Sequence, residues 1–486
     1  MPLSAARPLR PVVLVMALLS AVVPLWLSSP AAHAANADGR DDGHIRHDGL
    51  IRDEVTFRGG AGLPLHGTVV APASPSPHKV RAPGIVLLGG SGPGPRTEYR
   101  QEADAFARSG IVTLVFDKRT VGYSTLHVDF GLLADDALAG VRLLRSRAGV
   151  DPSKVGLWGF SEGGWVAPLA AARSGDVAYV ITLGGSGLNP LRTQTWNLTT
   201  HLRHRRITGS FPDAVAGPTA QLLHATGKFP EGDYDPSPVL ARLRQPVLAL
   251  WGVYDNQVPP AESARIFRET LGTAGNRHVT IRFLPGAAHN GHRTTDGFDR
   301  LGGPRYAGKR LGALASGSVD TMASWVRAVA AGKAPSSSAS PAPREQVVSA
   351  PLPGGTGYEV AALALLSAGF AGYAVTGFRR PATRCRPARP LAALGLTTVV
   401  GTLLCTLSVY VAGEGVAAPV IAGRPLAWLL LQLCAVGVLA LTAVTAASAW
   451  RHRDRYTRAT RTRLLALVTT GALFLPWALH WGLLAP

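Results

Sequence analysis

The chain has 486 residues and a formal net charge of +19, with 47% hydrophobic and 16% charged residues. This length has room for two or three domains. The charge suggests a nucleic-acid partner, but much of it flanks apolar segments: two Arg lie in the first ten residues, and twelve Arg against three acidic residues follow position 350. Because no basic helix carries interleaved aromatic residues, the composition predicts a membrane lipid partner and no nucleic-acid partner.

The first 34 residues have the pattern of a secretory signal peptide. Arg7 and Arg10 precede an apolar run at 11–27, and Ala32-His-Ala34 provides small residues for cleavage. The alternative is an uncleaved membrane anchor. In either case we expect the residues that follow to face away from the cytoplasm.

Residues 53–331 alternate between strand-like and helix-like segments. Strands are predicted at 55–57, 65–71, 84–88, 110–116, 155–158, 178–183, 246–251 and 279–284, and helices at 98–109, 131–147, 165–173 and 316–331. This alternation predicts right-handed crossovers and a mostly parallel sheet with helices on both faces. The pattern loosens at 185–244, which we interpret as an inserted cap. Its basic cluster at 202–206 is interpreted as a solvated helix face, with a contact to an acidic substrate group as the alternative.

Four apolar spans make up a predicted membrane domain at 358–486, after a linker at 332–357 whose Ala, Pro, Ser and Gly content predicts flexibility. The spans lie at 360–378, 391–412, 426–450 and 464–484, and each is long enough for a bilayer core of about 30 Å. The loops at 379–389 and 451–463 hold five and six Arg, whereas the loop between them holds one. By the positive-inside rule, we expect a multi-pass protein of the cell membrane whose 53–331 domain is extracytoplasmic.

The stretch at 155–165, Val-Gly-Leu-Trp-Gly-Phe-Ser-Glu-Gly-Gly-Trp, predicts a buried strand that turns sharply into a helix. Ser161 lies at the turn, with glycines two positions before and after it. A Gly-x-Ser-x-Gly pattern permits a strained turn that exposes the serine hydroxyl. The same letters also occur in ordinary loops, so the rest of the chain has to supply a base, a carboxylate and an oxyanion hole.

A carboxylate and a base follow in the order that such a site requires. Asp255 comes just after the strand at 246–251, and His289 just after the strand at 279–284, with His292 as a nearby rival base. A serine hydroxyl becomes a good nucleophile only when a base removes its proton, and the imidazole needs a carboxylate to fix its tautomer. We therefore predict Ser161, Asp255 and His289 as catalytic residues.

The oxyanion hole is predicted to combine the backbone amides of Glu162 and Ser91. Glu162 follows the serine, and Ser91 lies in the Gly-Gly-Ser-Gly loop after the strand at 84–88. No Gly-Lys-Ser/Thr follows this loop, so it does not match a phosphate-binding loop. All three cysteines lie beyond position 380, so the exported domain has no thiolate zinc site. Neither a metal nor an organic cofactor is predicted.

Residues from about 55 to 331 resemble an α/β-hydrolase. The sequences Gly-Phe-Ser161-Glu-Gly-Gly, Asp255 followed by Val258-Pro259, and Pro-Gly-Ala-Ala-His289 are most similar to the branch that holds dienelactone hydrolases, acyl-CoA thioester hydrolases and prolyl-oligopeptidase catalytic domains. The resemblance implies an α/β-hydrolase fold and serine hydrolase activity. The chain departs from many relatives at Gly89, where they have His. It also shows no N-terminal propeller of the oligopeptidase kind, and this second departure lowers the expectation of peptidase activity.

We therefore expect an exported, membrane-tethered serine hydrolase that cleaves a small-molecule or lipid-like ester or thioester through an acyl-enzyme. A serine peptidase of the prolyl-oligopeptidase type is the first alternative. The second is a membrane module whose outer domain is a degenerate, non-catalytic binding head. The complete set of Ser161, Asp255 and His289 argues against this second alternative.

Overall fold

A computed structural model describes residues 45–47, 49–73, 81–124, 127–306, 309–345, 347–349, 357–378, 385–412 and 419–486. The predicted signal peptide at 1–34 lies outside the described residues. The described chain forms two compact units. One holds His44–Ala364, Val400–Leu433 and Pro476–Pro486, and the other holds Leu365–Val399 and Cys434–Leu475.

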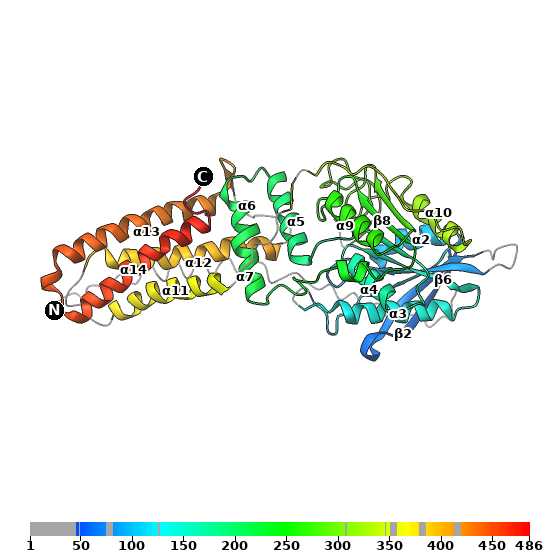
Figure 1. Ribbon diagram of the computed structural model, residues 1–486, viewed down its shortest axis with the longest axis horizontal. Helices are drawn as coiled ribbons and strands as arrows, with labels where there is room; N and C mark the ends of the chain where they lie inside the picture. Colours follow the sequence, from blue (N-terminus) through cyan, green and yellow to red (C-terminus); the bar gives the residue numbers. More distant parts are fainter. Residues whose placement is uncertain are drawn as a thin grey trace, which may run out of the picture. The chain divides into compact units, whose positions relative to one another are not determined.

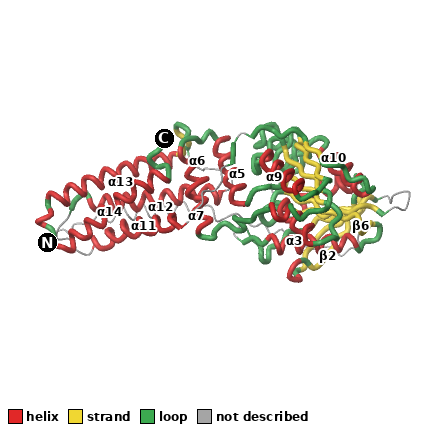
Figure 2. The backbone as a smooth tube through the Cα atoms, viewed as in Figure 1, coloured by secondary structure: helices red, strands yellow, loops and turns green. Residues whose placement is uncertain are grey.

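The first unit is built around a ten-stranded sheet, which is mostly parallel, as predicted (Figures 1 and 2). Its strands are β1 (Ile45–His47), β2 (Leu50–Arg58), β3 (Pro64–Pro72), β4 (Ala82–Leu88), β5 (Val112–Phe116), β6 (Val150–Phe160), β7 (Val180–Leu183), β8 (Val247–Gly252), β9 (Val279–Leu284) and β12 (Ser338–Ala339). The strand order is β1-β2-β3-β5-β4-β6-β7-β8-β9-β12. Strands β1, β2, β3 and β5 pair antiparallel in that sequence, and the remaining pairs are parallel.

Helices cover both faces of this sheet. One core joins it to α3 (Phe130–Arg145), α4 (Gly163–Arg173) and α9 (Pro260–Thr273), and the other to α2 (Arg100–Arg108) and α10 (Ser318–Ala330). Successive strand residues point to opposite faces: in β4, Val86 belongs to the first core and Leu87 to the second. Apolar residues therefore line the whole of a central strand, which is why continuous apolar runs predicted these strands correctly.

The cap lies between β7 and β8 and consists of α5 (Pro190–His204), α6 (Ser210–Ala214), the π-helical turn η4 (Val215–Thr219), α7 (Ala220–Ala225) and α8 (Ser237–Leu240). Asn189 starts α5 by accepting a hydrogen bond from the Arg192 amide at 2.8 Å. Within the same unit, the cap contacts residues at the ends of the apolar helices. The Tyr410 hydroxyl donates to the Val215 carbonyl at 3.0 Å, and the Trp428 indole donates to the Ser210 hydroxyl at 3.2 Å.

Part of the segment predicted as a flexible linker instead lies along the sheet. Strand β12 pairs in parallel with β9, with Ser338 opposite Thr280. Further on, the Trp196 indole donates to the Val347 carbonyl at 2.7 Å, and the Glu345 carboxylate accepts from the Glu262 amide at 2.9 Å. The physical reason is that β9 would otherwise expose unpaired backbone groups at the sheet edge, and β12 covers them.

Among the described residues, four helices are long and apolar enough to cross a membrane, as the four predicted spans require. They are α11 (Gly357–Phe378), α12 (Ala388–Ala412), α13 (Leu426–Arg451) and α14 (Arg458–His480). In the second unit they approach at small residues. A Cβ added to Gly369 would lie 2.2 Å from the Thr470 hydroxyl, and one added to Gly395 would lie 2.5 Å from the Phe370 ring. Close contact at glycine is typical of helices that pack in a bilayer.

Short elements complete the described chain: η2 (Gly60–Gly62), η3 (Arg96–Tyr99), β10 (Arg305–Tyr306), β11 (Lys309–Arg310), β13 (Val420–Ile421), β14 (Arg424–Pro425) and η5 (Arg453–Arg455). Strands β10 and β11 form a small hairpin in the loop that follows β9. This loop also carries several residues of the site described next.

Candidate active site

Ser161 lies at the turn between β6 and α4 with φ of 52°, a left-handed conformation that is uncommon for residues other than glycine. The flanking glycines make the turn possible. A Cβ on Gly159 would lie 2.0 Å from the Gly163 carbonyl oxygen, and one on Gly163 would lie 2.6 Å from the Leu88 carbonyl oxygen. The Ser161 amide is held by the Leu183 carbonyl at 2.9 Å. The predicted strained turn is therefore present.

Asp255 and His289 are brought together at the carboxyl ends of β8 and β9. The His289 Nδ1 lies 2.9 and 3.0 Å from the two carboxylate oxygens of Asp255. The carboxylate also accepts from the Gln257 and Val258 amides, both at 2.9 Å. Both side chains are buried, at 0% exposed for Asp255 and 3% for His289. Because a carboxylate can only accept here, Nδ1 carries a proton, and in the neutral ring the lone pair of His289 lies on Nε2.

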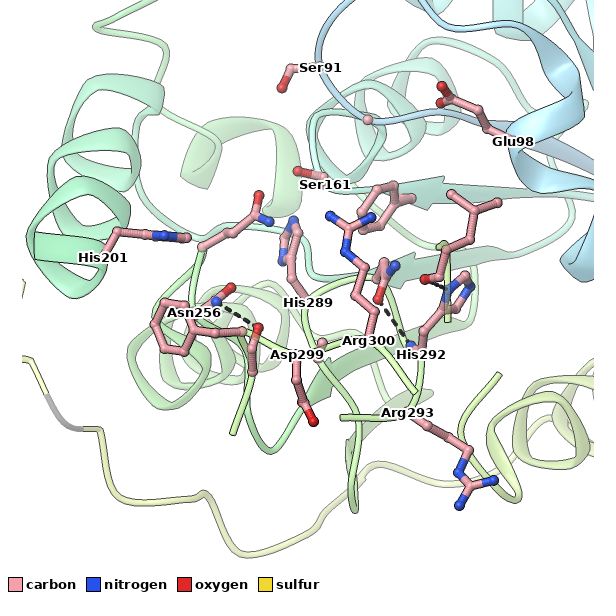
Figure 3. A pocket seen from close by; sticks show the side chains of 18 of the residues that line it. Ser91, Glu98, Ser161, His201, Asn256, His289, His292, Arg293, Asp299 and Arg300 are labelled. Atoms are coloured by element: carbon pink, nitrogen blue, oxygen red, sulfur yellow. Dashed lines mark hydrogen bonds between the residues drawn. The ribbon is translucent and has the colours of Figure 1, made fainter. Parts of the chain in front are cut away.

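This Nε2 has no hydrogen-bond partner among the described residues. His289 and Ser161 both line a cavity of about 580 Å³, and Figure 3 shows their side chains in the same part of it. Ser91 and Gly90 line this cavity as well. The structure thus gathers a serine at a strained turn and a buried, carboxylate-bound imidazole with a free nitrogen.

His292, the rival base, has both ring nitrogens engaged. Its Nε2 lies 2.8 Å from the Glu102 carboxylate, and its Nδ1 lies 2.8 Å from the Leu311 carbonyl oxygen. Both partners are acceptors, so both nitrogens carry protons and the ring is an imidazolium. Burial lowers the pKa of His292, but the hydrogen bond and charge of Glu102 outweigh burial and raise it above its ordinary value. A ring in this state has no lone pair with which to accept a proton from Ser161.

The His292 pair predicts a pH dependence of stability. A pKa raised in the folded protein stabilises it below the unfolded pKa of about 6.5, and this contribution is lost as pH rises through the folded pKa. We therefore expect the thermal midpoint of the full chain in detergent to fall as the pH rises above about 6.5. His292→Gln should have a lower midpoint at pH 6 and a flatter profile. Parallel profiles for the two proteins would show that the pair does not set the pH dependence.

The two predicted oxyanion-hole residues have unoccupied backbone amides. In the part of the chain that the structure describes, neither the Ser91 nor the Glu162 amide donates a hydrogen bond. Gly90 brings the two loops together, since a Cβ there would lie 3.0 Å from the Phe160 ring and 3.4 Å from the Ser161 Cβ. Such free amides beside a nucleophile are the groups that stabilise a developing oxyanion.

The side chains behind these amides were not identified from the sequence. Lys118 Nζ donates to the Gly90 carbonyl at 2.6 Å and to Tyr123 at 3.0 Å, and it forms an ion pair with Glu162. The Tyr123 hydroxyl accepts from the Gly92 amide at 2.8 Å and lies 3.0 Å from the Glu162 carboxylate. Burial and the neighbouring Glu162 raise the pKa of Tyr123, so the phenol keeps its proton and donates it to that carboxylate. One buried network therefore holds both the glycine-rich loop and the residue after Ser161.

Lys118→Met is expected to lower kcat for ester hydrolysis about 10- to 100-fold with little change in KM. Loss of an oxyanion donor lowers kcat about 10²- to 10³-fold, and we expect a smaller effect because the donors are only displaced here. It should also destabilise the protein, since Glu162 is left as a buried, unpaired charge. The double variant Lys118→Met/Glu162→Gln separates the two effects. It should recover thermal stability but not kcat.

Lys154→Met, at a lysine whose ion-pair partner is the surface residue Asp151, is the matched control. We expect it to leave kcat unchanged. A normal kcat in Lys118→Met, or full recovery of kcat in the double variant, would show that the network does not position the oxyanion donors.

The rest of the cavity wall comes from the cap and from the loop after His289. His201, His204 and Arg205 line it from α5 and its end, so part of the predicted basic cluster faces the cavity and is not only a solvated helix face. His204 stacks on Phe298 with ring centroids 3.6 Å apart. In the described chain, no group of three or more His, Cys, Asp or Glu residues is arranged to hold a metal ion.

Comparison with known proteins points to the same class of domain. Residues 132–301, which include Ser161, Asp255 and His289, match the Prolyl oligopeptidase family. Polyketide transferase ATR5 of Stachybotrys chlorohalonatus (strain IBT 40285) is 28% identical over 193 residues, covering 38% of this chain and 61% of the relative. Thiohydrolase aneE of Aspergillus aculeatus (strain ATCC 16872 / CBS 172.66 / WB 5094) is 30% identical over 134 residues, covering 27% of this chain and 40% of the relative.

The chain therefore spans less than two thirds of the length of these curated relatives. Among solved structures, a 2,6-dihydroxy-pseudo-oxynicotine hydrolase aligns with 59% of this chain and 69% of its own, with 21% identity and a TM-score of 0.38. The domain that carries Ser161, Asp255 and His289 has an α/β-hydrolase fold, and its residues 132–301 match the Prolyl oligopeptidase family.

Proposed function

We propose that this domain is a serine hydrolase that cleaves carboxylic esters or thioesters through an acyl-enzyme. The observation that carries the proposal is the buried Asp255–His289 pair: His289 Nε2 has no described partner, and His289 lines the same cavity as Ser161. A histidine held by a carboxylate and left with one free nitrogen is suited to general-base catalysis. The free amides of Glu162 and Ser91 support the proposal further.

The reaction then proceeds in two steps, acylation of Ser161 and hydrolysis of the acyl-enzyme. Ser161 Oγ attacks the carbonyl carbon while its proton passes to His289 Nε2, and the carbonyl oxygen becomes an oxyanion bound by the amides of Glu162 and Ser91. As the bond to the leaving oxygen or sulfur breaks, His289 returns the proton to the leaving group. A water molecule repeats the sequence on the acyl-enzyme, which releases the carboxylic acid and restores Ser161. Asp255 orients His289 and stabilises its transient positive charge.

A membrane setting favours small-molecule or lipid-like acyl substrates. The four apolar helices supply the tether, and the Arg-rich loops at 379–389 and 451–463 favour an extracytoplasmic hydrolase domain in the cell membrane. One relative is named a thiohydrolase, which supports thioesters as one substrate class. Cysteine substitution at exposed positions, with labelling by a membrane-impermeant maleimide on intact cells, tests the orientation. Labelling at Lys333→Cys but not at Arg453→Cys is expected.

A peptidase is the second candidate, because the matched family is the Prolyl oligopeptidase family. The full chain in detergent should be assayed on p-nitrophenyl esters, acyl thioesters and aminoacyl or peptidyl p-nitroanilides. We expect kcat/KM for the esters and thioesters to exceed that for the amides by at least about 100-fold. Amide turnover comparable to ester turnover would favour the peptidase. No turnover of any of the three classes would argue against both candidates.

A further inference from the structure

The charged residues that line the cavity are unbalanced in sign. Three arginines line it, Arg205, Arg293 and Arg300, but only two acidic residues do, Glu98 and Asp299. The carboxylate of Asp299 is already occupied by its own loop, because it accepts from the Thr295 amide and the Thr295 hydroxyl, both at 2.7 Å. A hydrogen bond from the Thr294 hydroxyl, together with these two from Thr295, lowers the pKa of Asp299 to about 2. The carboxylate therefore stays charged, but its hydrogen bonds go to its own loop. In Figure 3 its carboxylate points away from Ser161.

Arg300 is the cation that is best placed to act on a bound substrate. Figure 3 shows its guanidinium extending toward Ser161 and His289, whereas the side chain of Arg293 points away from them. The nearest partner of Arg300 is the Arg310 carbonyl, 3.4 Å from Nη1, and none of the described carboxylates lies within ion-pair distance. This guanidinium therefore retains most of its hydrogen-bonding capacity for a ligand.

The segment that carries Arg300 is held firmly by backbone hydrogen bonds. The Leu301 amide donates to the Arg293 carbonyl at 3.1 Å, and the Ala313 amide donates to the Leu301 carbonyl at 2.8 Å. The neighbouring Phe298 is clamped between His204, which stacks on it, and His201, which meets its edge with centroids 5.0 Å apart. Because the backbone at Arg300 is already fixed in this way, ligand binding costs less conformational entropy.

Arg205 approaches the same cavity from the cap. It follows α5 directly, and its side chain forms none of the ion pairs found in the described chain. An anion in the cavity can thus be contacted from the loop after His289 and from the cap. A guanidinium is a planar fork that matches the two oxygens of a carboxylate or a phosphate.

We propose that the cavity selects esters or thioesters that carry a carboxylate or phosphate group away from the scissile carbonyl, with Arg300 as its principal ligand and Arg205 as a second. The proposal rests on the serine hydrolase function proposed above and names its substrate class. It also explains why the cavity wall, despite its proximity to apolar strands, is lined by charged residues from two separate elements.

Two p-nitrophenyl esters of equal acyl length test the proposal on the full chain in detergent: the hemiglutarate, which carries a carboxylate, and the neutral valerate. We expect the wild type to prefer the hemiglutarate. In Arg300→Gln, the ratio of kcat/KM for hemiglutarate to that for valerate should fall at least about tenfold, as expected for loss of a charge-assisted hydrogen bond. Arg300→Lys should recover part of the ratio. Arg265→Gln, at an exposed residue of α9 that does not line the cavity, should leave the ratio unchanged.

A binding measurement separates failure of this proposal from failure of the hydrolase function. Glutarate and inorganic phosphate are titrated by calorimetry into Ser161→Ala, with and without Arg300→Gln. We expect Arg300→Gln to weaken the tighter of the two anions at least about tenfold, even if the wild type hydrolyses neither ester. Preference for phosphate over glutarate would identify the anionic group as a phosphate. An unchanged ester ratio, or equal anion binding with and without Arg300, would overturn the proposal.

Discussion

His289→Gln is expected to lower kcat for ester hydrolysis by about four to six orders of magnitude, the range seen when a member of a serine triad is removed. The Asp255–His289 pair is buried and His289 Nε2 has no other described partner, so no neighbouring group replaces it as the base. His292 lies three residues away but has both nitrogens bound to acceptors. Steady-state rates on a p-nitrophenyl ester measure the loss.

His278→Gln is the control for this substitution, since the exposed side chain of His278 has one hydrogen-bond partner in the described chain, the Pro335 carbonyl. It should retain wild-type kcat. If His289→Gln kept more than about 1% of wild-type kcat while remaining folded, His289 would not be the general base and the assignment of Asp255 would be lost with it.

Gly159→Ala is expected to lower the free energy of unfolding by about 3 to 5 kcal/mol, or to prevent accumulation of folded protein. The added Cβ would lie 2.0 Å from the Gly163 carbonyl oxygen, and this oxygen belongs to backbone that cannot rotate away. The first turn of α4 must then shift, which also displaces Ser161 and the Glu162 amide. Any protein that folds should therefore have lost most of its kcat.

Gly175→Ala is the matched control, because a Cβ added there meets no described atom within 4 Å. It should retain the wild-type thermal midpoint and kcat. Wild-type behaviour of Gly159→Ala in both measurements would show that the turn at Ser161 does not depend on the close approach of these two glycines.

The sheet, and the positions of the three predicted site residues on it, were predictable because their signals are local. Each of Ser161, Asp255 and His289 follows an apolar run, and parallel strands place such positions at one edge of the sheet. We did not need to know the strand order to expect the three residues at the same edge of the sheet. The four apolar helices were equally predictable, since length and composition decide whether a helix can cross a bilayer.

The features that the sequence did not reveal depend on contacts between distant residues. Lys118 and Glu162 lie 44 positions apart, and nothing near either residue indicates their ion pair. The apolar spacing of Ala264, Phe267 and Leu271 was a usable signal for α9, but mostly polar neighbours obscured it. Residues 332–345 have the composition of a linker, yet the open edge of β9 binds Ser338 and Ala339. Composition indicates whether a segment is flexible in isolation. Pairing with an open sheet edge can order the same segment.

The most direct test of the central claim is covalent labelling of the full chain by a fluorophosphonate probe, which reacts with a serine only when a base activates it. We predict one labelled site in the wild type, no labelling in Ser161→Ala, and retained labelling in Ser91→Ala, because Ser91 contributes its backbone amide and not its hydroxyl. Peptide mass spectrometry should place the adduct on the peptide that contains Ser161. Absence of labelling in folded wild-type protein, or labelling that persists in Ser161→Ala, would contradict the account.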